Sequence, residues 1–164
     1  MSQRLAALRD RLRADPDRGR LTYRTTVQLE DGMRCEAPFR RQVVVADEPA
    51  SAGGTDTAPN PLELAVGSLA TCQAITYQVW AAILGVRVDR IEVQVEGDID
   101  LAGFFGLAGD EDRPGFGAFR VGVRLSGPEH EERYRELEAA VDRHCPVLDL
   151  VGRPVPVERI HLDA

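Results

Sequence analysis

The stretch PNPLELAVGSLATCQAITYQVW, residues 59–80, constrains the fold more than any other part of the chain. Its apolar side chains recur at alternating steps of three and four, which gathers them on one side of an α-helix. Asn60 can cap such a helix, Pro61 suits its first position and Glu63 completes a capping box. A glycine follows the last apolar turn, so a long helix is predicted between these signals. Its apolar stripe comprises Leu62, Ala65, Leu69, Cys72, Thr76, Val79 and Ile83.

Alternating apolar and polar side chains predict β-strands on both sides of this helix. Before it, residues 21–29 alternate, Asp31-Gly32 is typical of a tight turn, and a second arm follows through Cys35. After it come two more strand-like stretches, a second helix that ends at a Cys-Pro pair, and a last strand-like stretch. These four later stretches are residues 88–101, 118–127, 129–145 and 155–162.

The order of these elements favours one fold class. The predicted order is a hairpin, a long helix, two strands, a helix and a strand. This order contains no repeated βαβ unit. We therefore expect an α+β fold in which a largely antiparallel sheet packs against two long helices that carry cysteines. Residues 1–19 are expected to form an N-terminal amphipathic helix or extension, and residues 20–164 a single domain. A Gly/Pro/Ser-rich loop at 47–61 and an acidic, glycine-rich loop at 103–116 connect the elements.

Composition excludes several classes of function. The net charge of −7 and a pI of about 5.0 argue against a nucleic-acid-binding protein that uses its overall field. All 20 basic side chains are arginines, so no lysine is present for Schiff-base chemistry or for a phosphate-binding loop. No stretch is long and apolar enough to cross a membrane. An odd number of cysteines without an apolar signal segment favours the cytoplasm.

Two of the three cysteines, Cys72 and Cys145, continue the apolar stripes of the two long helices. If both helices pack on one sheet, the two thiols can meet, and in a reducing compartment this suggests a redox pair. A buried cysteine is also a common small core side chain, so packing is the alternative interpretation. Cys35 falls on the apolar face of the first hairpin and is expected to be structural.

A reactive thiol needs a nearby cation, because a thiol with its ordinary pKa of about 8.5 is mostly protonated at neutral pH. Without lysine, that cation must be an arginine or a histidine. Glu63 could orient such an arginine, although its capping-box role explains this residue equally well. No spacing of histidines, cysteines or acids matches a zinc or calcium motif, so neither a metal nor a cofactor is expected. The candidate cations are Arg24, Arg34, Arg40, Arg41 and His144.

The stretch PNPLELAVGSLATCQAITY, followed at a distance by HCPVLDL, resembles the osmotically inducible protein C / organic hydroperoxide resistance (OsmC/Ohr) family. The similarity runs from about residue 20 to 163, and DEP, GGTD and GDIDLAGFFGL indicate a divergent OsmC-like branch. The resemblance implies a thiol-dependent peroxidase for organic (alkyl or lipid) hydroperoxides. It also implies an intertwined homodimer with its sites at the subunit interface.

The resemblance further assigns roles to individual residues. Cys72 would be the peroxidatic cysteine, which the peroxide oxidises to a sulfenic acid, and Cys145 would resolve it to a disulfide. A dithiol reductant, a lipoyl group in the family, would reopen that disulfide. Arg34 is the nearest positional match to the family's activating arginine. Glu63 lies one residue from the position of its helix-start glutamate.

A non-catalytic function is the alternative hypothesis. The same apolar dimer cleft could hold a lipophilic ligand, with the cysteines as core packing or as a redox sensor. The presence of both Cys72 and Cys145 favours the enzyme, whereas the shifted arginine and glutamate positions favour the binding protein. We expect neither a nucleic-acid partner nor membrane insertion.

Overall fold

The chain is described here by a computed structural model that divides into two compact units, residues 1–68 and 69–164. We call them the first unit and the second unit. Their boundary falls within helix α2, which covers Pro61–Leu84. The residues that the structure describes are 3–29, 32–107, 109 and 113–161.

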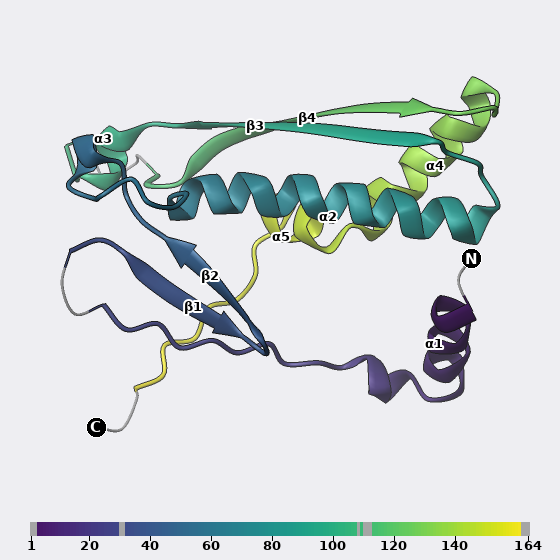
Figure 1. Ribbon diagram of the computed structural model, residues 1–164, viewed down its shortest axis with the longest axis horizontal. Helices are drawn as coiled ribbons and strands as arrows, with labels where there is room; N and C mark the ends of the chain where they lie inside the picture. The colour runs from purple at the N-terminus through teal and green to yellow at the C-terminus, as the bar shows by residue number, and fades with distance from the viewer. Residues whose placement is uncertain (1–2, 30–31, 108, 110–112, 162–164) are drawn as a thin grey trace. The chain divides into compact units, whose positions relative to one another are not determined.

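The first unit begins with a helix and contains one β-hairpin (Figure 1). Helix α1 covers Gln3–Ala14, and the 3-10 turn η1 follows at Pro16–Gly19. Strands β1 (Cys35–Phe39) and β2 (Gln42–Ala46) pair antiparallel. The turn between them includes Arg40 in the left-handed region, with a φ of 56°.

The position of this hairpin differs from the prediction. Residues 21–29 form no strand, although their side chains alternate, and the described hairpin turns between β1 and β2. The predicted turn was at Asp31-Gly32. Asp31 itself lies outside the described residues. A strand persists where its backbone N–H and C=O groups meet a partner strand. Within the described parts of the chain, residues 21–29 belong to no sheet.

Asp47 organises the loop between β2 and α2. Its buried carboxylate accepts hydrogen bonds from the backbone N–H groups of Glu48, Thr55 and Thr57 and from both threonine hydroxyls, at 2.6–3.4 Å. A 3-10 turn, η2, lies within the loop at Ala50–Ala52. The predicted Gly/Pro/Ser-rich linker is therefore a hydrogen-bonded structure built around one carboxylate.

Helix α2 begins and ends as predicted. The N–H of Asn60 donates to Oε2 of Glu63 at 2.9 Å, and the N–H of Glu63 donates to Oδ1 of Asn60 at 2.8 Å. These two bonds are the predicted capping box. At the other end, Gly85 has a φ of 67°, the left-handed conformation that commonly ends a helix.

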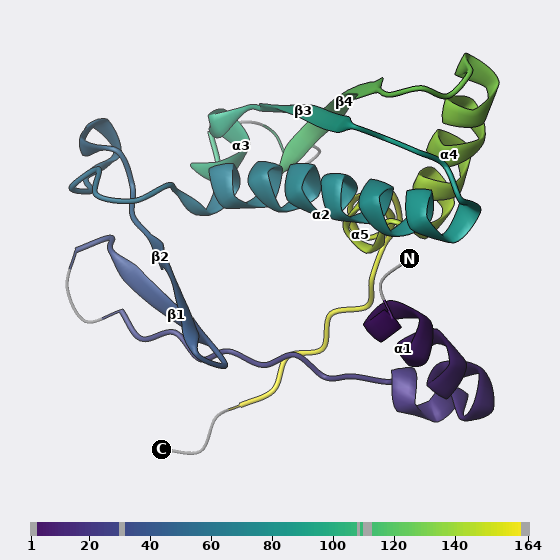
Figure 2. The ribbon, with the colours of Figure 1, turned by 45° about the vertical axis from the view of Figure 1, so that its right-hand side comes forward.

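The second unit packs helices against one hairpin. Strands β3 (Arg90–Ile99) and β4 (Phe116–Ser126) pair antiparallel, and the short helix α3 (Leu101–Phe104) lies between them in the sequence. Helices α4 (Glu131–His144) and α5 (Pro146–Gly152) follow. In Figures 1 and 2 the β3–β4 hairpin runs along the part of α2 that belongs to the second unit, and α4 meets the C-terminal half of α2.

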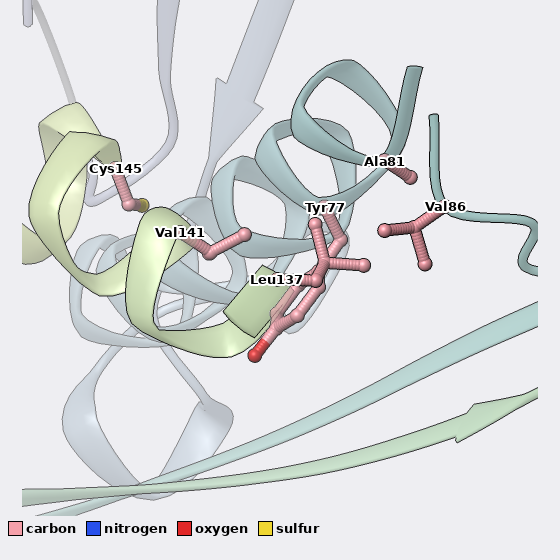
Figure 3. Close-up of a cluster of buried hydrophobic side chains, with 6 residues drawn as sticks. All are labelled: Tyr77, Ala81, Val86, Leu137, Val141 and Cys145. Atoms are coloured by element: carbon pink, nitrogen blue, oxygen red, sulfur yellow. The ribbon is translucent and has the colours of Figure 1, made fainter. Parts of the chain in front are cut away.

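The core of the second unit lies where α2 meets α4 (Figure 3). Aliphatic side chains of β3 and β4 pack against this cluster, as do Trp80 and Tyr134. Because α2 contacts both α4 and the hairpin, a broad face of this helix is covered. The buried members of the cluster are Tyr77, Ala81, Val86, Leu137, Val141 and Cys145.

The buried face of α2 is rotated relative to the predicted stripe. Cys72 is half-buried, and Ala65 is exposed, whereas Gln73 and Tyr77 are almost completely buried. The prediction placed Cys72 at the centre of the buried stripe. Because α2 contacts both α4 and the β3–β4 hairpin, the buried face is instead centred near Gln73. The buried residues of α2 are Leu69, Gln73, Thr76, Tyr77 and Ala81.

The observed fold agrees with the predicted α+β class with antiparallel strands. In the described residues it contains two separate two-stranded sheets, β1–β2 and β3–β4, in place of one larger sheet. The predicted final strand is not formed up to residue 161, and its last residue lies outside the described chain. Helices α3 and α5 were not predicted; residues 108 and 110–112 of the acidic loop also lie outside the described chain.

Three further expectations concern the chain as a whole. The intertwined homodimer and the single domain beginning at residue 20 stay predictions. Among the described residues, no helix has the length and apolar character needed to cross a membrane.

Candidate functional site

Two thiols of the second unit meet where α4 ends. Sγ of Cys145 lies 3.5 Å from Sγ of Cys72 and acts as the donor in this contact. Both cysteines are free thiols. Because a disulfide bond is about 2.05 Å long, the two sulfurs need to approach by about 1.5 Å to form one. The structure therefore brings together the two cysteines that the sequence analysis singled out.

Local backbone features hold Cys145 at the corner between α4 and α5. Its N–H donates to the carbonyl oxygen of Val141 at 2.9 Å, and its own carbonyl accepts from the N–H of Asp149 at 3.0 Å. Pro146 has no N–H and suits the first position of α5, so α4 stops and a new helix begins. The sequence predicted this stop but not the helix that follows it.

The two sulfurs differ in their access to solvent. Cys145 is 1% exposed and belongs to the hydrophobic cluster, whereas Cys72 is half-buried. A molecule that arrives from solvent therefore reaches Cys72 first. This asymmetry favours Cys72 as the sulfur that attacks a substrate and Cys145 as the sulfur that reacts afterwards.

Burial raises the pKa of the Cys145 thiol. A hydrogen bond from the backbone N–H of Leu148 opposes this effect, the adjacent Cys72 sulfur reinforces it, and the hydroxyl of Thr76 again opposes it. Thr76 also donates to the carbonyl oxygen of Cys72 at 2.7 Å. Because the net effect is a raised pKa, the Cys145 thiol keeps its proton at neutral pH. This agrees with its role as the donor toward Cys72.

His144 follows the same helix but engages other groups. Its Nδ1 lies 2.7 Å from the carbonyl oxygen of Ala140, and its ring centroid lies 4.0 Å from that of Trp80. The contacts of His144 therefore provide no support for its predicted role as the cation.

The predicted arginines all belong to the first unit, whereas the thiol pair belongs to the second. Nη2 of Arg34 lies 3.0 Å from Oε1 of Glu36, and both side chains are about half exposed. Arg34 and Cys35 line a cavity of about 870 Å³ within the first unit. The assignment of Arg34 as the activating arginine stays a prediction, as do those of Arg24, Arg40 and Arg41.

Glu63 also belongs to the first unit, where its exposed carboxylate completes the capping box with Asn60. That contact accounts for the residue type, and a role for Glu63 at the thiol site stays a prediction. Cys35 is a half-buried free thiol at the start of β1. In the described part of the chain, no group of three or more His, Cys, Asp or Glu side chains is arranged to hold a metal ion.

Sequence analysis missed a set of polar side chains that share neighbours with the thiol pair. Gln73 and Tyr77 of α2 and Glu138 and Asp142 of α4 line one cavity of about 580 Å³ in the second unit. Burial raises the pKa of the Tyr77 hydroxyl, and the charges of Glu138 and Asp142 add to this effect. Two features of the sequence could have indicated this cavity. One is Gln73 within an otherwise apolar helix, and the other is the pair Glu138 and Asp142, four residues apart on an amphipathic helix.

The α+β fold and the two adjacent thiols place this chain among proteins with a dithiol site between two helices, here α2 and the end of α4. The family model of the OsmC-like proteins matches residues 54–159, which is more than half of the 164 residues and includes both cysteines. The chain therefore belongs to the OsmC-like family, and the resemblance seen in the sequence is confirmed. No curated protein matches the chain.

Solved structures share this fold at low sequence identity. An OsmC-like protein from Mycoplasma pneumoniae is 16% identical, with a TM-score of 0.68, and the alignment covers 80% of this chain and 88% of that one. An organic hydroperoxide resistance protein OsmC from Legionella pneumophila is 18% identical, with a TM-score of 0.60 and coverages of 80% and 91%. An OsmC-like protein of unknown function from Vibrio cholerae is 12% identical, with a TM-score of 0.60 and coverages of 80% and 94%.

Proposed function

We propose that this protein is a thiol-dependent peroxidase that reduces organic hydroperoxides through Cys72 and Cys145. The observation that carries the proposal is the 3.5 Å separation of the two sulfurs, one half-buried and one sealed in the core. Membership of the OsmC-like family adds support, because one solved structure of the same fold is an organic hydroperoxide resistance protein.

In the first step, the Cys72 thiolate attacks the terminal oxygen of the hydroperoxide R–O–O–H. An S–O bond forms as the O–O bond breaks, so Cys72 becomes a sulfenic acid and the alkoxide RO⁻ leaves. The alkoxide takes the proton that Cys145 has kept, and the alcohol ROH is released. The raised pKa of Cys145 serves this step because it keeps a proton beside the reacting sulfur.

In the second step, the Cys145 thiolate attacks the Cys72 sulfur. The S–S bond forms as the S–O bond breaks, and the departing hydroxide takes a proton from solvent to become water. The peroxide is thereby reduced by two electrons, and the two thiols are oxidised to one disulfide. A dithiol reductant, with a lipoyl group as the proposed type, returns both sulfurs to thiols by exchange.

Activation of Cys72 requires a cation, for which Arg34 is the proposed residue, with Glu63 as the carboxylate that orients it. The proposed substrates are alkyl or lipid hydroperoxides. The proposed setting is the cytoplasm, where the thiols stay reduced between turnovers.

We further propose that the protein acts as an intertwined homodimer with the site at the subunit interface. Two segments of the described chain, residues 21–29 and 154–161, lie outside the sheets (Figure 2). Both expose large apolar side chains. Strand-forming segments in this state can pair with strands of a second copy. The most exposed of these side chains are Leu21 at 70%, Tyr23 at 83%, Val157 at 90% and Ile160 at 76%.

The test is a turnover assay with cumene hydroperoxide and dihydrolipoamide. Steady turnover is expected for the parent protein and for the matched control Cys35→Ser, whereas Cys72→Ser should lose it. Thiol titration before and after one equivalent of peroxide should show a rapid loss of two thiols per chain. A parent protein that keeps its thiols and shows no turnover would contradict the proposal.

The second candidate function is a non-catalytic binding protein or redox sensor for a lipophilic ligand. It is favoured by the contacts of the two proposed activating residues, because Arg34 pairs with Glu36 and Glu63 forms the capping box with Asn60. Oxidation of the thiol pair by peroxide without sustained reduction by any dithiol would favour the sensor. Binding of a fatty acid without thiol oxidation would favour the binding protein.

A further inference from the structure

The cavity in the second unit has a polar wall and an apolar wall. Its volume of about 580 Å³ lies within the range typical of small-molecule sites. The polar wall comes from two helices, α2 and α4, and the apolar wall comes mainly from strand β4. The polar lining residues are Gln73, Tyr77, Glu138 and Asp142, and the apolar ones are Val121, Val123 and Leu148.

Two of the polar side chains are almost completely buried, but their polar ends face the cavity and not another described residue. Gln73 is 1% exposed and Tyr77 is 2% exposed, yet neither the carboxamide nor the phenol hydroxyl bonds to another described residue. Every described side-chain nitrogen or oxygen that is sealed from solvent does have a partner. The free polar atoms of Gln73 and Tyr77 therefore open into the cavity. In Figure 3 the Tyr77 hydroxyl points out of the core cluster.

The carboxylates add a negative field to this cavity. Glu138 and Asp142 are four residues apart on α4, a spacing at which like charges repel. Other acids of this helix form ion pairs, Glu136 with Arg133 and Glu131 with Arg135, whereas Glu138 and Asp142 form none with the described residues. Both carboxylates raise the pKa of Tyr77, so their charge acts at the position of its hydroxyl.

The geometry points to this cavity as a binding site for an organic ammonium ion that carries an apolar group. The ammonium would lie against Glu138 and Asp142 and donate to the carbonyl oxygen of Gln73. The apolar group would lie against Val121 and Val123. Binding would neutralise the repulsion on α4 and would give the Gln73 amide a fixed hydrogen-bond partner in the cavity into which it opens. The inference is independent of the peroxidase chemistry, since none of the cavity's polar groups takes part in it.

The experiment is isothermal titration calorimetry of the full chain with three probes of equal length. Hexylammonium carries the proposed cation, hexan-1-ol is its neutral counterpart and hexanoate reverses the charge. We expect saturable binding of hexylammonium at one site per chain. The alcohol and the carboxylate should bind at least tenfold more weakly, because neither pairs with the two carboxylates.

The variants locate the site. Glu138→Gln combined with Asp142→Asn should weaken hexylammonium binding at least tenfold. The matched control, Glu131→Gln combined with Glu132→Gln, changes the same charge on the same helix and should bind as the parent does. If circular dichroism shows that the first double variant is unfolded, Gln73→Leu replaces it. Loss of the amide at nearly constant volume should weaken binding several-fold.

Three results would overturn the inference. One is the absence of saturable hexylammonium binding by the folded parent protein. Another is equal binding by the parent and by a folded cavity variant. A third is saturable binding of Mn²⁺ with no binding of hexylammonium, which would make the cavity a metal site. Peroxidase turnover is measured on the same samples, so a failure of the proposed function is distinguished from a failure of the ammonium site.

Discussion

Asp47 in the first unit and Cys145 in the second are equally buried, at 1% exposure. Their pKa values nevertheless shift in opposite directions. Hydrogen bonds from the Thr55 hydroxyl and from the N–H and hydroxyl of Thr57 keep the pKa of the Asp47 carboxyl well below its usual range. Cys145 lies in an apolar cluster, where burial raises its pKa. Burial alone therefore does not determine the charge of a group; the donors that face it decide.

This difference matches what each region can do. A carboxylate that accepts hydrogen bonds from three residues is a fixed charge, and these bonds connect the two ends of the loop segment from Glu48 to Thr57. A buried thiol with fewer donors keeps a proton that it can release when a neighbouring reaction demands one. The first arrangement stabilises structure, and the second is suited to chemistry.

The largest expected effect separates the two sulfurs of the pair. Cys72→Ser should lower peroxidase turnover at least 100-fold, because no other described thiol is both accessible and next to Cys145. Cys145→Ser should still reduce one equivalent of peroxide but should stop at the Cys72 sulfenic acid. Mass spectrometry of a sulfenic-acid adduct checks this difference. Equal single-turnover rates in both variants would show that the roles are not divided in this way.

The next effect concerns the fixed charge. Asp47→Asn replaces an acceptor of several hydrogen bonds with an amide that presents hydrogens toward the donors of Thr55 and Thr57. We expect a fall of several degrees in the Tm measured by circular dichroism. The matched control is Asp56→Asn, since Asp56 is exposed and asparagine tolerates its φ of 57°. A control that loses as much stability as Asp47→Asn would mean that the carboxylate has no special role.

The Asp47 loop also depends on a glycine. A Cβ on Gly54 would lie 1.8 Å from the carbonyl oxygen of Glu48, so Gly54→Ala must displace the backbone that donates to Asp47. We expect a lower Tm for this variant. Gly67→Ala, within α2, meets nothing within 4 Å and should stabilise the protein by about 0.5–1 kcal/mol. Urea unfolding gives the free energy of unfolding of both variants. A loss in Gly54→Ala alone would show that the steric clash at Gly54 is the cause, whereas a loss in both would point to the glycine-to-alanine change itself.

Much of this arrangement was predictable because its causes are local. The capping box, the stop at Pro146 and the stripe that carries Cys145 depend on residues within a few positions of one another. The α+β class and the candidate thiols followed from these local patterns.

The parts that were not predictable depend on contacts between distant residues. Residues 21–29 alternate like a strand, but pairing needs a partner that spacing cannot identify. The centre of the buried face of α2 depends on its contacts with both α4 and the hairpin, which is why Gln73 was missed. The cavity brings Gln73 of α2 together with Glu138 of α4, and no periodicity within either helix shows that they meet.

Opposite pKa shifts predict opposite pH dependence of stability. The lowered pKa of Asp47 contributes stability above its unfolded pKa of about 3.9, and this contribution is lost as the pH falls further. The stability difference between the parent and Asp47→Asn should therefore shrink between pH 5 and pH 2. The raised pKa of Cys145 contributes stability that is lost as the pH rises above about 8.5. The difference between the parent and Cys145→Ser should accordingly shrink above that pH, as measured by urea unfolding. If both stability differences shrank as the pH falls, or both as it rises, the opposite pKa shifts of Asp47 and Cys145 would be contradicted.

The smallest effect tests the donors that already face Cys145. The Thr76 hydroxyl lowers the pKa of Cys145 against the larger effect of burial, so Thr76→Val should raise that pKa further. Thr76→Ser keeps the hydroxyl and is the matched control. In a background without the other two cysteines, alkylation of Cys145 by iodoacetamide should need a higher pH in the valine variant than in the serine variant. Because the Thr76 hydroxyl also donates to the carbonyl oxygen of Cys72, its effect on Cys145 is small and we expect a shift of a few-fold in rate at fixed pH. Identical pH profiles would show that burial alone sets the proton affinity of Cys145, and the contrast with Asp47 would then reflect the chemistry of the groups and not their donors.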